Sequence, residues 1–280
     1  MNPSGGGASF PASLVLVGAG KMGGALLQGW LDLGLEPRRI RLIEPQPAPN
    51  ILALCAERGV RLVQNQTSTE EPPEVLVLAV KPQMLETVAP ALAALVGEAM
   101  LVISILAGKT MKDVLDRLPR ARAVVRAMPY LPAAIGRGIT GAIANSAVTP
   151  DQRQSADALL SAIGQVEWLA DEGLIDAVTA VSGSGPAYVF YLAECLAEAG
   201  RAAGLPADTA ARLARATIEG SGALLAQRID QSPAELRESV TSPGGTTAAA
   251  LDVLMGDEGL KPLIEKAVLA AKKRAGELSG

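Results

Sequence analysis

The chain has 280 residues, of which 49% are hydrophobic and only 2% aromatic, and its formal net charge is −4. This length favours two domains, and the charge gives no reason to expect nucleic acid or an anionic membrane surface as a partner. Histidine is absent, which excludes a Ser-His-Asp triad, a histidine base and histidine-ligated zinc. The two cysteines, Cys55 and Cys195, lie in different predicted helices, where we expect both to be buried, and we expect no metal site.

The N-terminal segment, residues 1–12, is rich in Gly, Ser and Pro and lacks the basic start and apolar core of a signal peptide. We therefore expect a disordered tail there, followed by domains over residues 13–170 and 171–280. The longest apolar run without a charge, residues 177–193, is shorter than the ~20 residues that a membrane span needs. Together these features predict a cytoplasmic protein.

A glycine-rich motif follows the first predicted strand. Residues 13–17 form the short apolar run of a buried parallel strand, and residues 24–33 show helical spacing. Between them lie the glycines of a G-x-G-x-x-G motif, Gly18, Gly20 and Gly23. Gly18 would permit a sharp turn, Gly20 a close approach of the backbone to a pyrophosphate, and Gly23 close packing of helix on strand. The order of strand, motif and helix favours a dinucleotide-binding loop over a simple turn.

An acidic residue ends the second predicted strand. That strand spans residues 39–43, and Glu44 comes about twenty residues after the motif, where an acidic side chain binds ribose hydroxyls and repels a 2′-phosphate. The pattern predicts NADH in preference to NADPH as cofactor. A solvated loop glutamate is the alternative.

The rest of the first half alternates between strands and helices. Strands are expected over residues 60–63, 75–80, 101–105, 123–127, 138–145 and 165–168, and helices over residues 50–58 and 110–118 and after Thr149. This alternation predicts an α/β fold with a doubly wound parallel sheet. Ligands bind beyond the carboxyl ends of such strands, so Lys81 and Met128, which follow or end predicted strands, are candidate cleft residues. A solvated loop cation is the alternative for Lys81.

The second half is predicted to be all helical. Helices are expected over residues 172–181, 186–204, 206–227, 233–240, 247–255 and 260–278, and their alanine-rich faces suit dimerisation. Gly183 and Gly185 lie just before the second of these helices. Two glycines so close together imply a close approach, either at a tight joint between helices or at a site.

One loop of the helical half suits an anion. Residues 241–247 precede a helix, so that backbone N–H groups at the helix start can bind a carboxylate. An ordinary Pro-Gly turn with a threonine cap is the alternative.

Several of these segments, taken together, resemble the pyrroline-5-carboxylate reductases. They are residues 18–22, 79–82, 104–108, 126–129, 176–188 and 242–247, and the resemblance extends over residues 14–278. It implies an N-terminal Rossmann domain followed by a helical dimerisation domain, with the active site where the first domain of one subunit meets the second domain of its partner. It also implies reduction of the cyclic imine 1-pyrroline-5-carboxylate to L-proline by NADH or NADPH. The expected assembly is a homodimer, with a larger ring of dimers as a further option.

The resemblance also implies roles for particular residues. Thr247 would hydrogen-bond the ring nitrogen of the substrate, and Lys81 would add positive charge near it, so these two are the candidate catalytic residues. The other implied cofactor-binding residues are Gly18, Ala19, Gly20, Lys21, Met22, Gly23, Glu44, Ala79, Val80, Ala107 and Met128, with Lys81 among them as well. The implied substrate-binding residues are Tyr130, Leu131, Ser242, Pro243, Gly244, Gly245, Thr246 and Thr247.

The chain departs from the family pattern at one point. The family usually has Met-Pro-Asn-Thr-Pro where this chain has Met-Pro-Tyr-Leu-Pro, so that Tyr130 and Leu131 replace an amide and a hydroxyl. This difference leaves two alternatives open. One is an imine reductase of altered substrate scope on the same scaffold, and the other is a nucleotide-binding protein without catalysis.

Overall fold

The computed structural model of the protein describes residues 10–64, 71–130, 132 and 136–279. The predicted N-terminal tail therefore lies mostly outside the described residues, as does Leu131. The chain forms two compact units: the first takes in the chain up to Gly183 together with residues from Lys272 onward, and the second is Ser184–Ala271. The two units are defined by compactness and not by independent folding. The domain boundary predicted between residues 170 and 171 therefore stays a prediction.

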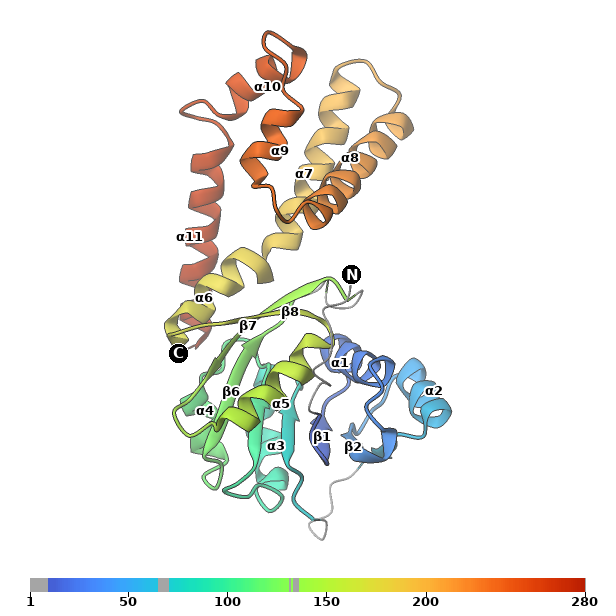
Figure 1. Ribbon diagram of the computed structural model, residues 1–280, viewed down its shortest axis with the longest axis vertical. Helices are drawn as coiled ribbons and strands as arrows, with labels where there is room; N and C mark the ends of the chain where they lie inside the picture. Colours follow the sequence, from blue (N-terminus) through green and yellow to red (C-terminus); the bar gives the residue numbers. More distant parts are fainter. Residues whose placement is uncertain (1–9, 65–70, 131, 133–135, 280) are drawn as a thin grey trace. The chain divides into compact units, whose positions relative to one another are not determined.

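The first unit is built on an eight-stranded sheet (Figure 1). Its strands are β1 (Leu14–Val17), β2 (Ile40–Ile43), β3 (Arg61–Val63), β4 (Val75–Leu78), β5 (Leu101–Ser104), β6 (Ala123–Met128), β7 (Gly138–Ala144) and β8 (Gly164–Trp168). They lie in the order β3-β2-β1-β4-β5-β6-β7-β8. The direction of winding reverses between β1 and β4, which is the topological switch point where doubly wound sheets bind ligands. The predicted α/β class is confirmed.

The sheet is parallel only in part. Strands β1 to β6 pair in parallel, whereas β7 runs antiparallel to β6, and β8 runs parallel to β7. The predicted parallel sheet is therefore confirmed for β1 to β6, whereas β7 and β8 run in the opposite direction. A parallel pair needs a crossover of about a dozen residues or more, and only nine residues separate β6 from β7.

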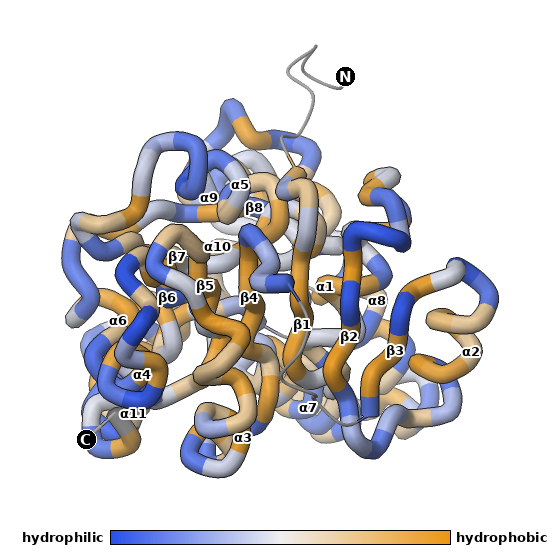
Figure 2. The backbone as a smooth tube through the Cα atoms, turned by 90° about the horizontal axis from the view of Figure 1, so that it is seen from below, coloured by the Kyte–Doolittle hydropathy of each residue, from blue (hydrophilic) through white to orange (hydrophobic). Residues whose placement is uncertain are grey.

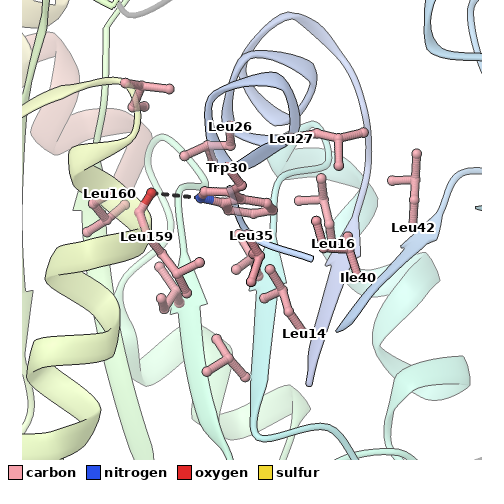
Figure 3. Close-up of a cluster of buried hydrophobic side chains, with 14 of the residues drawn as sticks. Leu14, Leu16, Leu26, Leu27, Trp30, Leu35, Ile40, Leu42, Leu159 and Leu160 are labelled. Carbon is pink, nitrogen blue, oxygen red and sulfur yellow. Dashed lines mark hydrogen bonds between the residues drawn. The ribbon is translucent and has the colours of Figure 1, made fainter. Parts of the chain in front are cut away.

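Helices cover both faces of this sheet. Helices α1 (Lys21–Asp32), α2 (Pro49–Arg58) and α5 (Pro150–Ser161) pack on one face, and α3 (Leu85–Leu92) and α4 (Met111–Arg117) on the other. Trp30 of α1 is fully buried in the cluster of apolar side chains between α1, α2, α5 and the sheet. Its indole N–H donates a 2.8 Å hydrogen bond to the carbonyl of Leu159 (Figure 3). The strands β1 and β4 between the two layers are hydrophobic throughout (Figure 2), as expected for strands buried on both faces.

Local signals place most helix ends. Thr110 and Thr149 each form a capping box at the start of α4 and α5, with Asp113 and Gln152 as the reciprocal partners. Helix α3 was not among the predicted elements, since Pro90 lies inside it and interior proline disfavours a helix. Burial of its apolar face against the sheet offsets that penalty.

The segment after β8 is less regular than predicted. Residues 172–181 were expected as one helix, but the chain forms a 3-10 turn (Glu172–Leu174), a short α6 (Ile175–Val178) and a π-helical turn (Thr179–Gly183). The hydroxyls of Thr179 and Ser182 donate hydrogen bonds to carbonyls four residues earlier, at 2.8 and 2.9 Å. Such bonds compete with the regular helical pattern and often bend helices.

The second unit is helical, as predicted. It contains α7 (Gly185–Ala202), α8 (Ala207–Gln227), α9 (Pro233–Ser239), α10 (Thr246–Leu254) and the first part of α11 (Leu260–Ser279). Among its described residues only Ala210 and Ala214 are buried, while large apolar side chains such as Ile229, at 88% exposure, face solvent in the single chain. Cys195 on α7 is also exposed, so the prediction that both cysteines are buried holds only for Cys55. In the part of the chain that the structure describes, no helix is long and apolar enough to cross a membrane.

Candidate cofactor and substrate sites

The three glycines of the loop after β1 have three different surroundings. Gly18 has a φ of 94°, and a β-carbon on it would lie 2.8 Å from the carbonyl oxygen of Ala79. A β-carbon on Gly23 would lie 2.2 Å from the carbonyl oxygen of Gly18, so α1 packs directly on the loop. Gly20, in contrast, would place a β-carbon more than 4 Å from any described atom. The first and third glycines are thus required by this chain's own packing, and the second leaves space open.

Helix α1 presents its N-terminus at this open space. The helix begins at Lys21, three residues earlier than predicted, and Gly20 caps it without any side-chain hydrogen bond. The first N–H groups of a helix have no partner within the helix, and the helix dipole adds positive potential there. Lys21, Met22 and Gly23 therefore offer backbone N–H groups suited to a pyrophosphate. The open space at Gly20 and this helix start fit a dinucleotide.

Glu44 lies beside the same loop. One carboxylate oxygen accepts a 2.9 Å hydrogen bond from the N–H of Ala19, and the other accepts a 3.1 Å bond from the N–H of Gln46. Both bonds fix the carboxylate at the carboxyl end of β2, next to the glycine loop. The solvated-loop alternative for Glu44 is therefore wrong, because the side chain is half-buried and doubly bonded.

The loops after β4 and β5 lie at the same edge of the sheet. Ala79 and Val80 contact Gly18 from the loop after β4, and the N–H of Ile105 bonds to the carbonyl of Leu78, joining the next loop to it. Lys81 is exposed at the end of this stretch and forms no ion pair with a described residue. Its ammonium group is available for an anion at the crevice.

The loop after β5 contains Ala107, another predicted cofactor-binding residue. Ala107 is exposed, and the turn closes through a 3.2 Å bond from the N–H of Lys109 to the carbonyl of Leu106, with Gly108 at a φ of 70°. A β-carbon on Gly108 would lie 2.9 Å from the carbonyl oxygen of Leu278, near the C-terminus. The end of α11 therefore packs on this loop.

Met128 ends β6 and contacts the π-helical turn. A β-carbon on Gly183 would lie 3.5 Å from the methyl of Met128, an ordinary contact, and one on Gly185 would meet no described atom within 4 Å. A tighter approach is at Gly141 of β7, where a β-carbon would lie 2.8 Å from Val178 of α6. The close approach predicted for Gly183 and Gly185 stays a prediction, and the one at Gly141 was missed by sequence reasoning. A glycine inside a predicted strand was the signal that could have found it.

Of the two residues that depart from the family pattern, only Tyr130 is described. It is half-buried, and its hydroxyl donates a 3.4 Å hydrogen bond to the carbonyl of Arg137, so the ring is tied to its own loop. Leu131 lies outside the described residues.

The predicted anion loop in the second unit forms a tight turn. The N–H of Gly245 bonds to the carbonyl of Ser242 at 3.0 Å, and Gly244 has a φ of 69°, so Pro243 and Gly244 make the corner. Gly245 is the N-cap of α10 and has no side-chain cap. A β-carbon on Gly245 would lie 2.5 Å from the Ser242 hydroxyl oxygen, which places that hydroxyl at the helix start.

Thr247 is the second residue of α10 and not its cap. The helix begins at Thr246, so the alternative of a threonine cap is wrong. Thr247 is half-buried, whereas Thr246 is exposed. No described residue takes a hydrogen bond from the Thr247 side chain in the single chain.

No described cluster of histidine, cysteine, aspartate or glutamate has the spacing to hold a metal ion. Charged side chains of the first unit form ion pairs, and one of these has a buried member: Arg126 of β6 contacts the half-buried Glu172 at 2.9 Å. Sequence reasoning did not single out this pair, since the two residues are far apart in the chain.

Two family models match the chain. Residues 172–278 match the model described as pyrroline-5-carboxylate reductase dimerisation. Residues 13–108 match the model described as NADP oxidoreductase coenzyme F420-dependent. Together they cover the glycine loop, strands β1 to β5 and nearly all of the helical half.

Full-length relatives agree with both models. The chain is 40% identical over 266 residues to a pyrroline-5-carboxylate reductase of Pseudomonas aeruginosa, covering 95% of this chain and 96% of the relative. It is 42% identical over 268 residues to that of Synechocystis sp., covering 95% and 97%.

Among solved structures, the pyrroline-5-carboxylate reductase of Coxiella burnetii matches with a TM-score of 0.89 and 36% identity, covering 96% of this chain and 99% of that one. The Plasmodium falciparum pyrroline carboxylate reductase with NADP bound matches with a TM-score of 0.76 and 25% identity, covering 98% and 100%. With a dinucleotide-type glycine loop at the switch point and full-length identity of 40% and above to such enzymes, this chain belongs to the pyrroline-5-carboxylate reductase family.

Proposed function

We propose that this protein reduces 1-pyrroline-5-carboxylate to L-proline with a nicotinamide dinucleotide as hydride donor. The observation that carries the proposal is the open space at Gly20, between the α1 N-terminus and Glu44, in a chain of this family. Neither the backbone of Gly20, whose φ is −65°, nor the packing around it requires a glycine, whereas the close approach of a pyrophosphate would. We therefore favour an active oxidoreductase over the non-catalytic alternative.

For the cofactor, the family model and the relative with NADP bound support a nicotinamide dinucleotide. We propose NADH as the preferred form, because the Glu44 carboxylate faces the loop where a 2′-phosphate would meet like charge. Of the arginines near β2, Arg38, Arg39 and Arg41, which could offset this repulsion, the first two hydrogen-bond Glu36. Their charge is already engaged.

The chain's own groups have mainly positioning tasks. When bound, the reduced nicotinamide supplies the hydride, and the protonated imine carbon is already an electrophile. We propose that the N–H groups at the start of α10 and the Ser242 hydroxyl bind the substrate carboxylate, and that the Thr247 hydroxyl bonds the ring nitrogen. Lys81 adds positive charge beside the anionic substrate. No histidine is needed, since no strong base takes part.

Tyr130 supports a second candidate, an imine reductase of altered scope. Its phenol stands where the family usually has an amide, and its hydroxyl is bonded within its own loop rather than left for a ligand. A larger or less polar cyclic imine would suit a substrate site lined by this ring.

The helical segment 172–278 is a dimerisation domain, so the protein is a homodimer. We propose that these dimers can assemble into a larger ring, as predicted from the resemblance, and that the protein is cytoplasmic. Light scattering after gel filtration tests the first proposal, and cell fractionation tests the second.

One assay separates the candidate functions. NADH oxidation is followed by the absorbance of the reduced nicotinamide, with pyrroline-5-carboxylate or with a carboxylate-free cyclic imine. Turnover of the first supports the proposed reaction. Turnover of only the second supports the altered-scope alternative, and cofactor binding without any turnover contradicts both.

A further inference from the structure

The first unit contains an ion pair that the reaction described above does not use. The Arg126 side chain is only 5% exposed, and its guanidinium donates a 2.9 Å hydrogen bond to the Glu172 carboxylate. The same carboxylate oxygen accepts a 2.8 Å bond from the N–H of Met111, the first residue of α4. The Glu172 side chain is 29% exposed, so only one member of the pair is fully buried, and the desolvation of Arg126 offsets much of the attraction. Its place in the fold therefore needs another reason.

On the strand side, the pair lies next to the ligand edge. Arg126 pairs in register with Ser104, the last residue of β5, and lies two residues before Met128, so Arg126 and Met128 point to the same face of the sheet. Gly141 is the antiparallel partner of Met128, and on this face it contacts Val178 of α6. Arg126 and Met128 thus both lie under the segment that follows Glu172.

On the helix side, Glu172 holds two segments at once. Through Met111 it fixes the start of α4, which directly follows the loop that contains Ala107. Through the chain it leads into α6 and the turn whose Gly183 lies beside Met128. The segment that begins at Glu172 thus contacts β6 at two places. One is the ion pair with Arg126, and the other is the contact of Gly183 with Met128.

We propose that Arg126 and Glu172 are positioning residues for the reaction. Together they hold Met128 and the loop of Ala107 at the cofactor edge, and neither touches substrate or cofactor. This inference rests on the proposed function, in which Met128 and Ala107 line the nicotinamide dinucleotide site.

Two conservative variants test the proposal. Glu172→Gln keeps the size and an acceptor for Met111 but removes the charge, and Arg126→Lys keeps the charge but loses the planar fork. We expect each to raise KM for NADH and lower kcat, with a combined loss in kcat/KM of about tenfold to a hundredfold, since a 1 Å misplacement can have an effect of that size. The double variant should lose less than the product of the single losses, because both remove one interaction.

The matched control is the ion pair between the last residues of α1 and α2. Arg58 binds Asp32 there at 2.8 Å, at helix ends that lie away from the carboxyl ends of the strands. Arg58→Lys and Asp32→Asn should lower the melting temperature of the full chain at most and leave kcat and KM unchanged. If one edge variant fails to fold, the other still gives the kinetic result.

Two readouts decide the outcome. Variants of Arg126 or Glu172 that show wild-type kcat and KM below their melting temperature, with only a lower melting temperature, overturn the proposal. The dissociation constant of NADH, measured by fluorescence without substrate, is the second readout, and an increase confined to the edge variants supports the proposal. If the wild-type protein does not reduce pyrroline-5-carboxylate, the proposed function fails by itself, and the NADH measurement still decides the role of the pair.

Discussion

At the scale of single residues, Gly20 and Gly23 of the loop after β1 give opposite expectations for substitution by alanine. Gly20 has open space and a negative φ, so alanine fits there without touching this chain. We expect Gly20→Ala to fold with a normal melting temperature but to bind NADH at least about tenfold more weakly, because the methyl group occupies the approach of a pyrophosphate. Equilibrium titration of NADH fluorescence measures this.

The matched variant is Gly23→Ala. Its β-carbon would lie 2.2 Å from the Gly18 carbonyl oxygen, a backbone atom that cannot rotate away. We expect a loss of stability of about 1–3 kcal/mol, typical of overpacking, seen as a lower melting temperature. A Gly20→Ala protein that is unstable but binds NADH normally would contradict the assignment of the open space to the cofactor.

The Glu44 carboxylate sets the cofactor preference in our proposal. Two unit charges 4 Å apart near a protein surface repel by about 4 kcal/mol in a simple Coulomb estimate. Glu44→Gln removes the charge and keeps an acceptor for the Ala19 N–H. We expect the ratio of kcat/KM for NADPH over NADH to rise at least about tenfold, which corresponds to only 1.4 kcal/mol of relieved repulsion. A wild-type preference for NADPH that Glu44→Gln leaves unchanged would show that the 2′-phosphate does not meet this carboxylate.

Thr247 is the proposed partner of the substrate nitrogen. Because Gly245 is the helix cap, Thr247→Ala removes no capping bond, and a normal melting temperature is expected. We expect kcat to fall by about fivefold to 150-fold, the equivalent of 1–3 kcal/mol for one lost hydrogen bond, with little change in cofactor affinity. Thr247→Ser, which keeps the hydroxyl, should retain most activity. The neighbouring Thr246→Ala is the control, and equal losses in both variants would argue against a specific role.

At the scale of secondary structure, the capping boxes are the most local and most predictable features. At the start of α9, the Ser232 N–H and hydroxyl donate to the Glu235 carboxylate at 2.7 and 2.8 Å, and the Glu235 N–H donates back to the Ser232 hydroxyl. These bonds from Ser232 hold the pKa of Glu235 below its ordinary value of 4.5. The cap therefore stabilises the fold fully above pH 4.5 and is lost as the pH falls through the lower pKa of the folded state.

This sign leads to a pH-dependent prediction. Glu235→Ala should lower the melting temperature at pH 7, and its difference from wild type should shrink steadily below the ordinary glutamate pKa of 4.5. Glu238→Ala, which removes only an exposed contact to Arg237, is the control and should show a smaller difference. Differential scanning calorimetry across pH gives both. A Glu235→Ala difference that grows in acid would contradict the direction of the pKa shift.

The elements that sequence patterns predicted are those whose signals are local. Apolar runs placed β1 to β6 within one or two residues, and Thr149 with Pro150 and Gln152 placed the start of α5. The direction of β7 could not be predicted, because it depends on which strand edge is free after β6. The irregular turn before α7 was not predicted for a similar reason. Its neighbour α6 packs on β7 through Val178 and Gly141, which are far apart in the chain.

The candidate site divides in the same way. The glycine loop and Glu44 follow one strand order and one spacing, so their proximity could be predicted from the sequence. The link from Arg126 to Glu172 joins residues 46 positions apart, and no periodicity reports it. The role of Gly141 was missed for the same reason, since only the folded chain shows what lies above it.

At the scale of the whole molecule, the two units differ in how they bury apolar surface. The sheet of the first unit has a cluster of buried side chains on each face. The second unit buries only alanines among its described residues and leaves Ile229, Val253 and Leu269 largely exposed in the single chain. Large apolar side chains exposed in such number on one helical unit are typical of an interface. The helices of the dimerisation domain thus depend on a second copy for their core.

The last prediction follows from this dependence. If the second unit gains its core from a partner, folding and association are coupled, and the melting temperature must depend on protein concentration. We expect each tenfold dilution to lower it by about 1 °C, since tenfold in concentration is worth about 1.4 kcal/mol per dimer and two chains of this length unfold with an entropy of roughly 1.2 kcal/mol/K. Val253→Asp, which places a charge on an exposed apolar position, should weaken the dimer and steepen this dependence. Gln231→Asp in the same unit adds the same single charge at an exposed polar position and serves as the control. A melting temperature that is constant over three decades of concentration, measured by differential scanning fluorimetry, would mean that each chain of this protein is stable without its partner.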